Sequence, residues 1–381
     1  MTLKQAVGKL HLWLGLSAGL VVFIVSLTGA IFTFQDEIRD ATQPWRMVAS
    51  PAAHAAPLPP SRLLAAVVAQ HPGATPSWTT YYGPGRSATV HFTDKTGGSY
   101  VASLNPFDAQ VLHEQDLATD FFTVVQAIHM HLLLPAPWGE WVVGGAITIF
   151  LVMLGTGLVL WWPRRRQERQ QRLTIKWGAK WRRLNYDLHQ VLGFYIAAGA
   201  FIIGLTGLFM SFGSWMTAAS RVANLGQHYP LEETPPTVDA RAAATAPARP
   251  LVDVAYQQVR QQSPTAEMVL IGPTADRKQP VYCLTYQRAL HYYQRDEYYF
   301  HPVSGRLLRA LPHAGKSAGK KLGDLNYDLH TGQLLGLGSK VVAFLISLLS
   351  ASLPVTGTLL WWGRRHKTAR PKPRAAATVR A

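Results

Sequence analysis

The sequence predicts a membrane α-helical protein: a four-transmembrane-helix bundle from a duplicated helix–domain–helix unit, with two α+β modules outside the membrane. Three observations predict this fold class: four long apolar stretches, an uneven distribution of Lys and Arg, and an internal repeat. Only 15% of the 381 residues are charged, and the apolar residues are clustered. This composition argues against an ordinary soluble protein.

Four stretches contain no Asp, Glu, Lys or Arg and are long enough to cross a bilayer, which takes about 20 apolar residues. They cover residues 10–35, 141–162, 188–220 and 341–363. The first stretch begins like a signal peptide, but its apolar run is too long for one and no clear cleavage site follows. We therefore expect an uncleaved first helix. The third stretch is longer than one span needs, so part of it should lie outside the membrane.

The basic residues predict the orientation. Residues 1–10, 163–188 and 363–381 hold 18 of the 37 Lys and Arg residues and two acidic residues, which accounts for the whole net charge of +16. Segments rich in Lys and Arg face the cytoplasm, so both termini and the central loop should be cytoplasmic. The rest of the chain is neutral. We therefore expect attraction to anionic membrane lipid and no nucleic-acid partner.

These signals divide the chain into transmembrane helices, outer modules and basic cytoplasmic segments. The four transmembrane helices are expected at 1–35, 139–163, 188–216 and 337–363. The outer modules are expected at 36–138 and, with a linker, at 217–336. The basic cytoplasmic loop is expected at 164–187 and the basic tail at 364–381.

The two halves of the chain share a pattern. LNYDLH occurs at residues 184–189 and again at 325–330. HLWLGLSAGLVVFIVSLTGAIFTF, from His11, aligns without a gap with HQVLGFYIAAGAFIIGLTGLFMSF, from His189. Helices 2 and 4 have matching ends, TGLVLWWPRR and TGTLLWWGRR. We interpret the repeated unit as a helix, an outside domain and a returning helix.

Each outside segment is predicted to begin with a helix, at residues 61–72 and 252–264, and to continue with strands. The predicted strands lie in VHFTD and SYVASLNPFDAQVLHEQD of the first segment and in VYCLTYQRALHYYQRDEYYFHPVSGRLLR of the second. We expect two α+β modules of about 60 residues each. Residues 232–250, rich in Pro, Thr and Ala, are the predicted linker to the second module.

The repeat places histidines at two depths. His11 and His189 are expected to begin helices 1 and 3 on the cytoplasmic side; His129 or His131, together with His330, should begin helices 2 and 4 on the outer side. Residues two apart do not share a helix face, so only one of His129 and His131 should bind a given metal. Neutral imidazole is a good axial ligand for haem iron. Two pairs at two depths favour two bis-histidine haem b sites; ordinary interfacial histidines are the alternative.

Two further features bear on this hypothesis. Each helix carries Thr-Gly near its far end, which either makes room for a porphyrin or allows close helix packing. These pairs are Thr28-Gly29, Thr156-Gly157, Thr206-Gly207 and Thr356-Gly357. Cys283 is the only cysteine, which excludes an internal disulfide, a Cys-ligated iron–sulfur cluster and a C-x-x-C-H haem attachment.

These motifs resemble the PepSY-associated transmembrane family over nearly the whole chain. The resemblance is carried by the histidines that begin the helices, L-T-G in helices 1 and 3, the T-G-x-x-L-W-W-P/G-R-R ends and the paired outside modules. It implies that these two modules are PepSY-like. Within the family the chain is most similar to ferric-siderophore (ferrioxamine) reductases of the bacterial inner membrane. The family pattern H-x-x-L-L-L fits His129 and not His131.

The resemblance implies an oxidoreductase with two b haems, bound by His11, His189, His129 and His330. It would pass electrons across the inner membrane and reduce an Fe(III)-siderophore in the periplasm, with a ferrioxamine-like hydroxamate as the expected substrate. The chain has no G-x-G-x-x-G motif, so the electron donor should be a quinol or a separate cytoplasmic reductase.

Three alternatives remain at this stage. One is a non-enzymatic PepSY membrane protein that binds a periplasmic peptide or protein. Another is a haem electron-transfer protein with a different acceptor, and the third is a transporter of the iron–siderophore. Two aromatic groups either line a chelator site or belong to the strand core; they are Trp78, Tyr81 and Tyr82, and Tyr292, Tyr293, Tyr298 and Tyr299.

Overall fold

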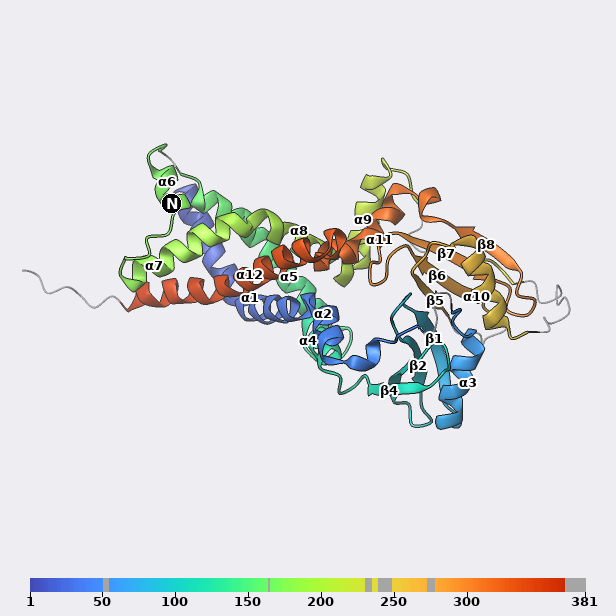
Figure 1. Ribbon diagram of the computed structural model, residues 1–381. Coiled ribbons are helices and arrows are strands. Elements are labelled where there is room, and N and C mark those ends of the chain that lie inside the picture. The colour runs from blue at the N-terminus through green and yellow to red at the C-terminus, as the bar shows by residue number, and fades with distance from the viewer. Residues whose placement is uncertain (51–54, 164, 230–234, 239–248, 273–277, 367–381) are drawn as a thin grey trace, which may run out of the picture.

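A computed structural model describes residues 1–50, 55–163, 165–229, 235–238, 249–272 and 278–366. A long helical bundle carries the N-terminus and the end of the last helix, and an eight-stranded sheet lies beyond its other end (Figure 1). We call these the terminal end and the sheet end of the bundle. Most of the predicted linker at 232–250 and of the tail at 364–381 lies outside the described residues.

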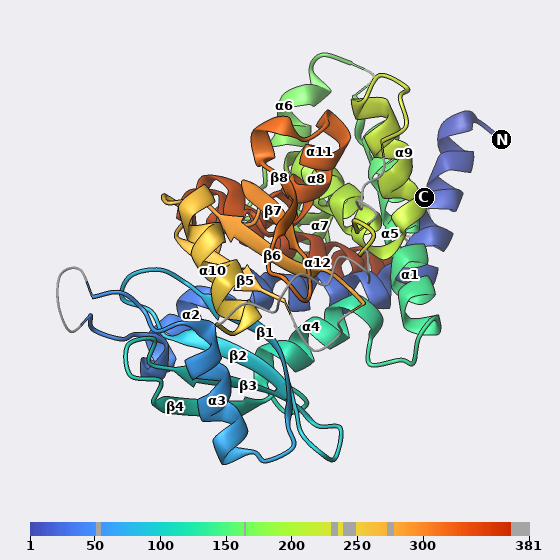
Figure 2. The same cartoon turned by 90° about the vertical axis from the view of Figure 1, so that its right-hand side faces the viewer.

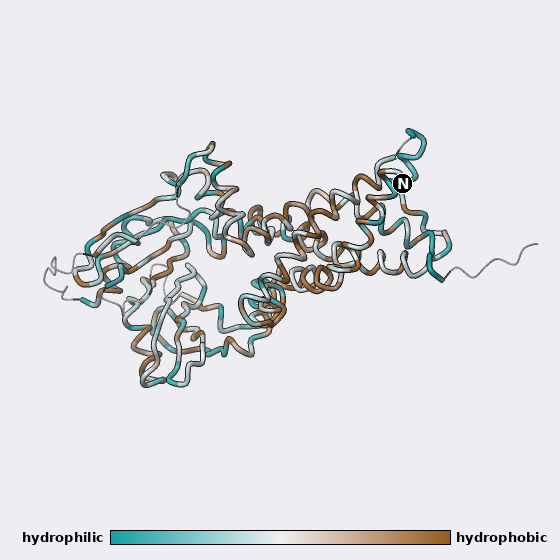
Figure 3. Tube along the Cα trace, turned by 180° about the vertical axis from the view of Figure 1, so that it is seen from behind, coloured by the Kyte–Doolittle hydropathy of each residue, from teal (hydrophilic) through white to brown (hydrophobic). Residues whose placement is uncertain are grey.

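Four helical stretches of the described chain are long and apolar enough to cross a membrane. They are Leu3–Thr33 (α1), Trp138–Trp161 (α5), Trp181–Ser211 and Leu337–Arg365 (α12). Apolar residues run along the bundle, and hydrophilic residues gather at its terminal end (Figure 3). The prediction of a membrane protein is confirmed.

The third stretch consists of three pieces. It contains α7 (Trp181–Asp187), one π-helical turn η2 (Leu188–Leu192) and α8 (Gly193–Ser211). The helix therefore begins at Trp181, before the predicted start at residue 188. The apolar excess of this stretch continues into a separate helix, α9 (Gly213–Ala223).

Small residues allow the spanning helices to pack closely. α1 and α8 each contact both α5 and α12. The buried core of the bundle consists of Ala18, Val22, Ala146, Phe150, Leu154, Ile196 and Ala200. Close approach of helix backbones at such positions is the usual basis of helix association in membranes, where burial of apolar surface supplies little driving force.

The sheet is a single antiparallel sheet in the order β4-β3-β2-β1-β5-β6-β7-β8. The strands of its first half are β1 (Thr75–Tyr81), β2 (Ala88–Thr93), β3 (Ser99–Leu104) and β4 (Val111–Asp116). Those of its second half are β5 (Met268–Ile271), β6 (Val281–Tyr286), β7 (Arg295–Phe300) and β8 (Leu307–Leu311). Each half is a four-stranded meander that follows a helix, as expected for the two modules.

The two modules join edge to edge, which the sequence analysis did not anticipate. β1 pairs with β5, so that Thr80 lies opposite Leu270. The preceding helices, α3 (Pro60–Gln70) and α10 (Leu251–Gln262), cover one face of the sheet together (Figure 2). One continuous core fills the space beneath them, with Leu63 from α3 and Val259 from α10 both fully buried. The sheet and its covering helices are therefore one domain.

Short helices connect the sheet to the bundle. α2 (Gln35–Thr42) and η1 (Pro44–Arg46) follow α1, and α4 (Phe121–His131) precedes α5. In the second half, η3 (His313–Gly315), α11 (Ala318–Thr331) and η4 (Gln333–Leu335) precede α12. At the terminal end, α6 (Glu168–Leu173) lies in the basic loop.

Candidate functional site: two facing histidine pairs

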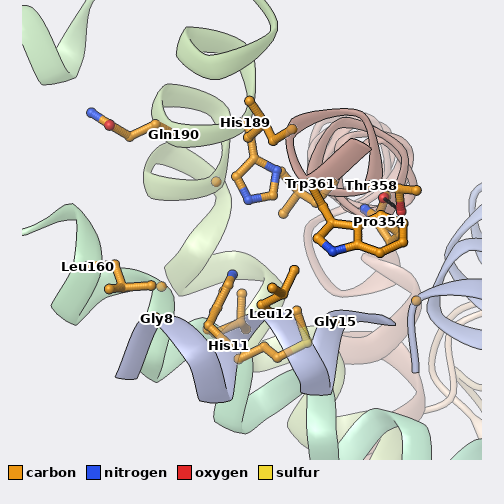
Figure 4. Close-up of a pocket in the computed structure, with 18 of the residues that line it drawn as sticks. Gly8, His11, Leu12, Gly15, Leu160, His189, Gln190, Pro354, Thr358 and Trp361 are labelled. Atoms are coloured by element: carbon orange, nitrogen blue, oxygen red, sulfur yellow. Dashed lines mark hydrogen bonds between the residues drawn. The ribbon is translucent and has the colours of Figure 1, made fainter. Parts of the chain in front are cut away.

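His11 and His189 face each other near the terminal end of the bundle. His11 comes from α1 and His189 from the π-helical turn η2, and their ring centroids are 6.4 Å apart. Figure 4 shows the two rings reaching toward one another, with Trp361 beside them. They line a cavity of about 430 Å³ whose other walls are mostly apolar side chains and glycines. This volume is within the usual range for cofactor sites.

His129 and His330 form a second pair near the sheet end, with ring centroids 6.0 Å apart. The sequence analysis expected these residues to begin the spanning helices, and this was wrong. His129 lies in the last turn of α4 and His330 in the last turn of α11, and both helices end before α5 and α12 begin. Each of the two histidines lies on a short helix of its own, and its ring contacts the spanning helix that precedes this short helix in the chain. α4 packs on α1, and α11 packs on α8.

His131 is the last residue of α4 and has different surroundings. It adjoins Gly139 of α5, and its Nδ1 is buried without a hydrogen-bond partner among the described residues. The ring that lies against His330 is that of His129. Of the two candidates, the structure therefore pairs His129 with His330, and His129 is the one that the resemblance favoured.

Hydrogen bonds fix the tautomer of all four paired rings. Each Nδ1 lies within 3.3 Å of a threonine hydroxyl of the neighbouring helix, and that threonine belongs to a Thr-Gly pair. The contacts are His11–Thr156, His189–Thr356, His129–Thr28 and His330–Thr206. Each of these hydroxyls donates its own hydrogen to a helix carbonyl one turn back. The threonine oxygen must therefore accept a hydrogen bond from Nδ1–H, which leaves the Nε2 lone pair free to bind a metal.

The glycine of each Thr-Gly pair makes room for the histidine ring. A methyl group added at Gly29 would lie 2.9 Å from Cε1 of His129, and one at Gly207 would lie 3.0 Å from Cε1 of His330. At Gly157 and Gly357 the corresponding distances to His11 and His189 are 3.4 and 3.3 Å. Thr-Gly is thus a seat for an imidazole: threonine orients the ring, and glycine allows it to approach the backbone.

The repeated LNYDLH adds an asparagine to this seat. Nδ2 of Asn185 donates to the carbonyl of Thr356, the residue that also binds His189. In the second copy, Nδ2 of Asn326 donates to the carbonyl of Thr206. The asparagine and the histidine are one helical turn apart, so both side chains reach the same threonine.

The aspartates of the two copies also bind nearby groups. Asp187 accepts a hydrogen bond from the guanidinium of Arg183, at 3.1 Å, and lies near the Lys176 amide. Asp328 accepts from the main-chain amides of Tyr292 and Tyr293. In both copies the aspartate ties the histidine's helix to a neighbouring segment.

Each pair offers two nitrogen ligands. Among the described residues, no group of three or more His, Cys, Asp or Glu side chains is placed to hold a metal ion. The donor set therefore suits a metal whose other ligands come from a cofactor, as the porphyrin supplies them to haem iron.

The family model described as the PepSY-associated TM region matches residues 9–364. The chain belongs to this family. The match covers all four spans, both histidine pairs and the sheet. No protein of curated function matches the chain.

A buried ion cluster ties the His330 helix of this PepSY-associated protein to the sheet. The Nζ atom of Lys316, wholly buried, lies 2.7 Å from Glu297 of β7 and 2.6 Å from Asp324 of α11. Lys320 adds a contact of 3.1 Å to Glu297. Burial alone would raise the pKa of Glu297, but the hydrogen bond from Lys316 and the two lysine charges lower it to about 2. Such a cluster holds its members in one geometry, since breaking it would leave a buried charge unpaired.

The remaining described histidines form no further facing pair, although one buried ring nitrogen of each of His291, His301 and His313 has no hydrogen-bond partner among the described residues. Nε2 of His71 lies 2.8 Å from a carboxylate oxygen of Glu114, and His113 stacks on Trp45. His54 lies outside the described residues.

The π-helical turn at His189 was not predicted, although such turns are frequent at functional sites.

The aromatic groups divide between the two faces of the sheet, as strand alternation requires. Tyr81 and Tyr298 are buried in the core beneath the helices. Trp78 and Tyr299 lie on the opposite face, where both rings contact Tyr282. The strand-core interpretation therefore applies to Tyr81 and Tyr298.

Proposed function

We propose that this PepSY-associated protein is a di-haem b oxidoreductase of the bacterial inner membrane. In this proposal it carries electrons outward and reduces Fe(III) held by a siderophore, which releases Fe(II) in the periplasm. The observation that carries the proposal is the pair of facing imidazoles at each end of the bundle, with every Nε2 left free by a hydrogen bond at Nδ1.

The separation of the rings suits axial ligation. An imidazole nitrogen binds a metal such as zinc at about 2.0–2.1 Å, and a similar bond to iron on both sides would place two ring centroids about 6 Å apart. The observed separations are 6.4 and 6.0 Å. The nearly equal separation at both ends supports one role for both pairs.

The depths of the pairs suit transfer across a membrane. His11 and Thr28, which seats His129, are 17 residues apart on α1. A helix of that length rises about 25 Å, close to the hydrocarbon thickness of about 30 Å. The two sites would therefore lie near opposite faces of the bilayer.

When bound, haem would supply one-electron exchange between ferric and ferrous iron. The chain's own residues would do the rest. Four histidines would hold the iron, four threonines would keep Nδ1 protonated, and the apolar cavity around His11 and His189 would exclude water. A hydrogen bond from Nδ1 also makes the opposite nitrogen a stronger ligand.

The positive-inside distribution supports placing the terminal end in the cytoplasm and the sheet in the periplasm. The electron donor in this proposal is a membrane quinol or a separate cytoplasmic reductase. The acceptor is Fe(III) in a hydroxamate chelate, whose hard oxygens bind Fe(II) poorly, so that reduction releases the metal.

The matching seats in the two halves support an origin by duplication.

The test begins with oxidised and dithionite-reduced visible spectra of the detergent-purified chain, with a haem count by pyridine haemochrome. About two haems per chain are expected, with sharp reduced bands typical of two axial histidines. Ferrioxamine added to the reduced protein should then reoxidise it. The same chelator loaded with gallium is the control, because Ga(III) does not accept an electron.

Two variants sharpen this test. His129→Ala should lose about one haem of the two, and His131→Ala, two residues away, should keep both. A colourless protein after expression with ample haem would overturn the redox proposal and leave a non-enzymatic PepSY binding protein. Two haems without reoxidation by ferrioxamine would retain the haem protein and reject the siderophore as acceptor.

A further inference from the structure

The two ligands of the outer pair are held very differently. This difference bears on which ligand can leave the iron, and the inference rests on the proposed haem at His129 and His330. Both rings have equivalent seats, because each Nδ1 donates to a main-chain carbonyl at 2.9 or 3.0 Å and faces a threonine hydroxyl. The difference lies in the helices that carry them.

The helix of His330 is fixed by buried polar bonds along its length. Asn326 donates to the Thr206 carbonyl, and Asp328 accepts three hydrogen bonds from the amides of Tyr292 and Tyr293. Asp324 belongs to the buried ion cluster. Any displacement of His330 would disturb several of these bonds and leave buried polar groups unpaired, which is unfavourable.

Among the described residues, the helix of His129 has no such side-chain attachments near the ring. The residue one turn before His129 is Val125, where the other ligand helix has Asn326. Within the described part of the chain, no other side chain of residues 125–131 makes a hydrogen bond that positions this turn. α4 is fixed at its far end instead, where Asp120 caps the helix and pairs with Arg39.

The chain after His129 is also poorly suited to hold it. α4 ends two residues later, and Leu132 and Leu133 both adopt left-handed conformations, with φ of 54° and 58°. Such conformations are unfavourable for branched side chains. Met130 and Leu133 are 46% and 60% exposed, so neither of these two side chains adds much packing to the turn.

We propose that His330 is the fixed ligand of the outer haem and His129 the exchangeable one. A small neutral diatomic ligand of ferrous haem would then enter on the His129 side. The exchange breaks the bond from iron to Nε2 of His129 and forms one from iron to the incoming ligand, with no change in electron count. Nδ1 keeps its proton throughout.

Carbon monoxide added to the dithionite-reduced full-length protein tests this proposal. Thr28→Val removes the hydroxyl that faces His129, and Thr206→Val is the matched change at His330. Thr28→Val keeps the 2.9 Å bond to the Val25 carbonyl and removes the 3.3 Å contact to the hydroxyl. It should therefore speed the binding of carbon monoxide about 2-fold, with about 10-fold as the upper limit for one whole lost hydrogen bond. Thr206→Val should leave the rate unchanged but shift the infrared stretch of the bound ligand, because His330 lies opposite it.

Three controls make the outcome decisive. Thr28→Ser keeps the hydroxyl and should restore the wild-type rate, and Thr156→Val, which loosens His11 in the inner pair, should leave the rate at the outer haem unchanged. A faster rate in Thr206→Val, with the infrared shift in Thr28→Val, would reverse the assignment. Normal haem content with no carbon monoxide adduct in any variant would reject this inference alone, whereas a wild-type protein without haem would reject the proposed function.

Discussion

The side-chain amide of Asn326 donates a 3.1 Å hydrogen bond to the main-chain carbonyl of Thr206. The hydroxyl of the same threonine lies 3.0 Å from Nδ1 of His330. Asn185 and Thr356 repeat this arrangement at His189. The two identical six-residue segments thus make the same contacts. In each, the asparagine bonds to the carbonyl of a threonine, a contact that we call the clamp, and the histidine one turn later lies against the hydroxyl of the same threonine.

The first prediction concerns the cost of this clamp. Oδ1 of Asn326 is buried without a partner among the described residues. An unpaired buried acceptor costs about 1–3 kcal/mol, whereas the donated bond contributes about 0.5–1.5 kcal/mol. We therefore expect that Asn326→Leu does not lower the thermal midpoint measured by circular dichroism. The same variant should release haem faster to an excess of apomyoglobin, because the ring seat is looser.

The control for the clamp is Gln262→Leu, a change at an exposed position on α10. It should alter neither the thermal midpoint nor haem release. A lower midpoint for Asn326→Leu with unchanged haem release would show that the asparagine stabilises the fold and does not serve the site.

The second prediction concerns the glycine seats. Gly29→Ala places a methyl group 2.9 Å from the His129 ring and should displace that ring, with loss of haem from the outer site. Gly145→Ala and Gly155→Ala meet nothing within 4 Å on α5 and should keep their haem. These two changes should also stabilise the helix by up to about 1 kcal/mol. Haem content per chain, measured as pyridine haemochrome, distinguishes the groups; equal content in all three variants would remove the role assigned to Gly29.

The sequence allowed the spans and the paired histidines to be predicted because both are local signals. Long apolar runs identify spanning helices without knowledge of their neighbours. The alignment of His11 with His189 likewise required only the spacing along each helix. Their similar depth followed directly from this alignment, and the structure brings the two rings to a centroid separation of 6.4 Å.

The spacing along the helices puts each Thr-Gly pair level with a histidine pair, but the hydrogen bonds of the seats could not be predicted, because they join distant segments. Thr206 and His330 are 124 residues apart, and nothing in the local sequence states that one binds the other. The strands that join the modules were also missed. β1 contains Pro76 and several polar residues, and β5 has four residues, so neither shows the alternation that indicates a strand.

The third prediction concerns the acid stability of the domain that contains the sheet. The pKa of Glu297 falls from 4.5 to about 2 in the folded protein, so its carboxylate favours folding. That contribution is complete above pH 4.5 and is lost as the pH falls from 4.5 toward about 2. The thermal midpoint should therefore decrease across this interval.

Glu297→Gln isolates this effect. The variant should be less stable at neutral pH, because Lys316 and Lys320 lose a buried partner, and its midpoint should fall less steeply below pH 4.5. Glu140→Gln, at an exposed carboxyl group, is the control and should retain the wild-type slope. Parallel curves for the wild type and Glu297→Gln would contradict the assignment.

The last prediction concerns the joint between the two modules. Both the main-chain amide and the hydroxyl of Ser61 on α3 donate to the carboxylate of Asp253 on α10, at 2.9 and 2.7 Å. These bonds link the helices that cover the paired strands β1 and β5. Hydrogen bonds to a charged group contribute about 1.5–3 kcal/mol, so Asp253→Ala should weaken the joint by that order. Amide hydrogen exchange in β1 and β5 measures the loss locally.

A double-mutant cycle tests whether the two residues act together. Ser61→Ala removes only the hydroxyl bond and should cost less than Asp253→Ala. The double variant should resemble Asp253→Ala alone, with a coupling energy of about 0.5–3 kcal/mol. Gln261→Ala, at an exposed position on α10, should leave exchange unchanged. Additive effects of the two changes would mean that the helices stabilise their own modules separately and that strand pairing alone holds the sheet together.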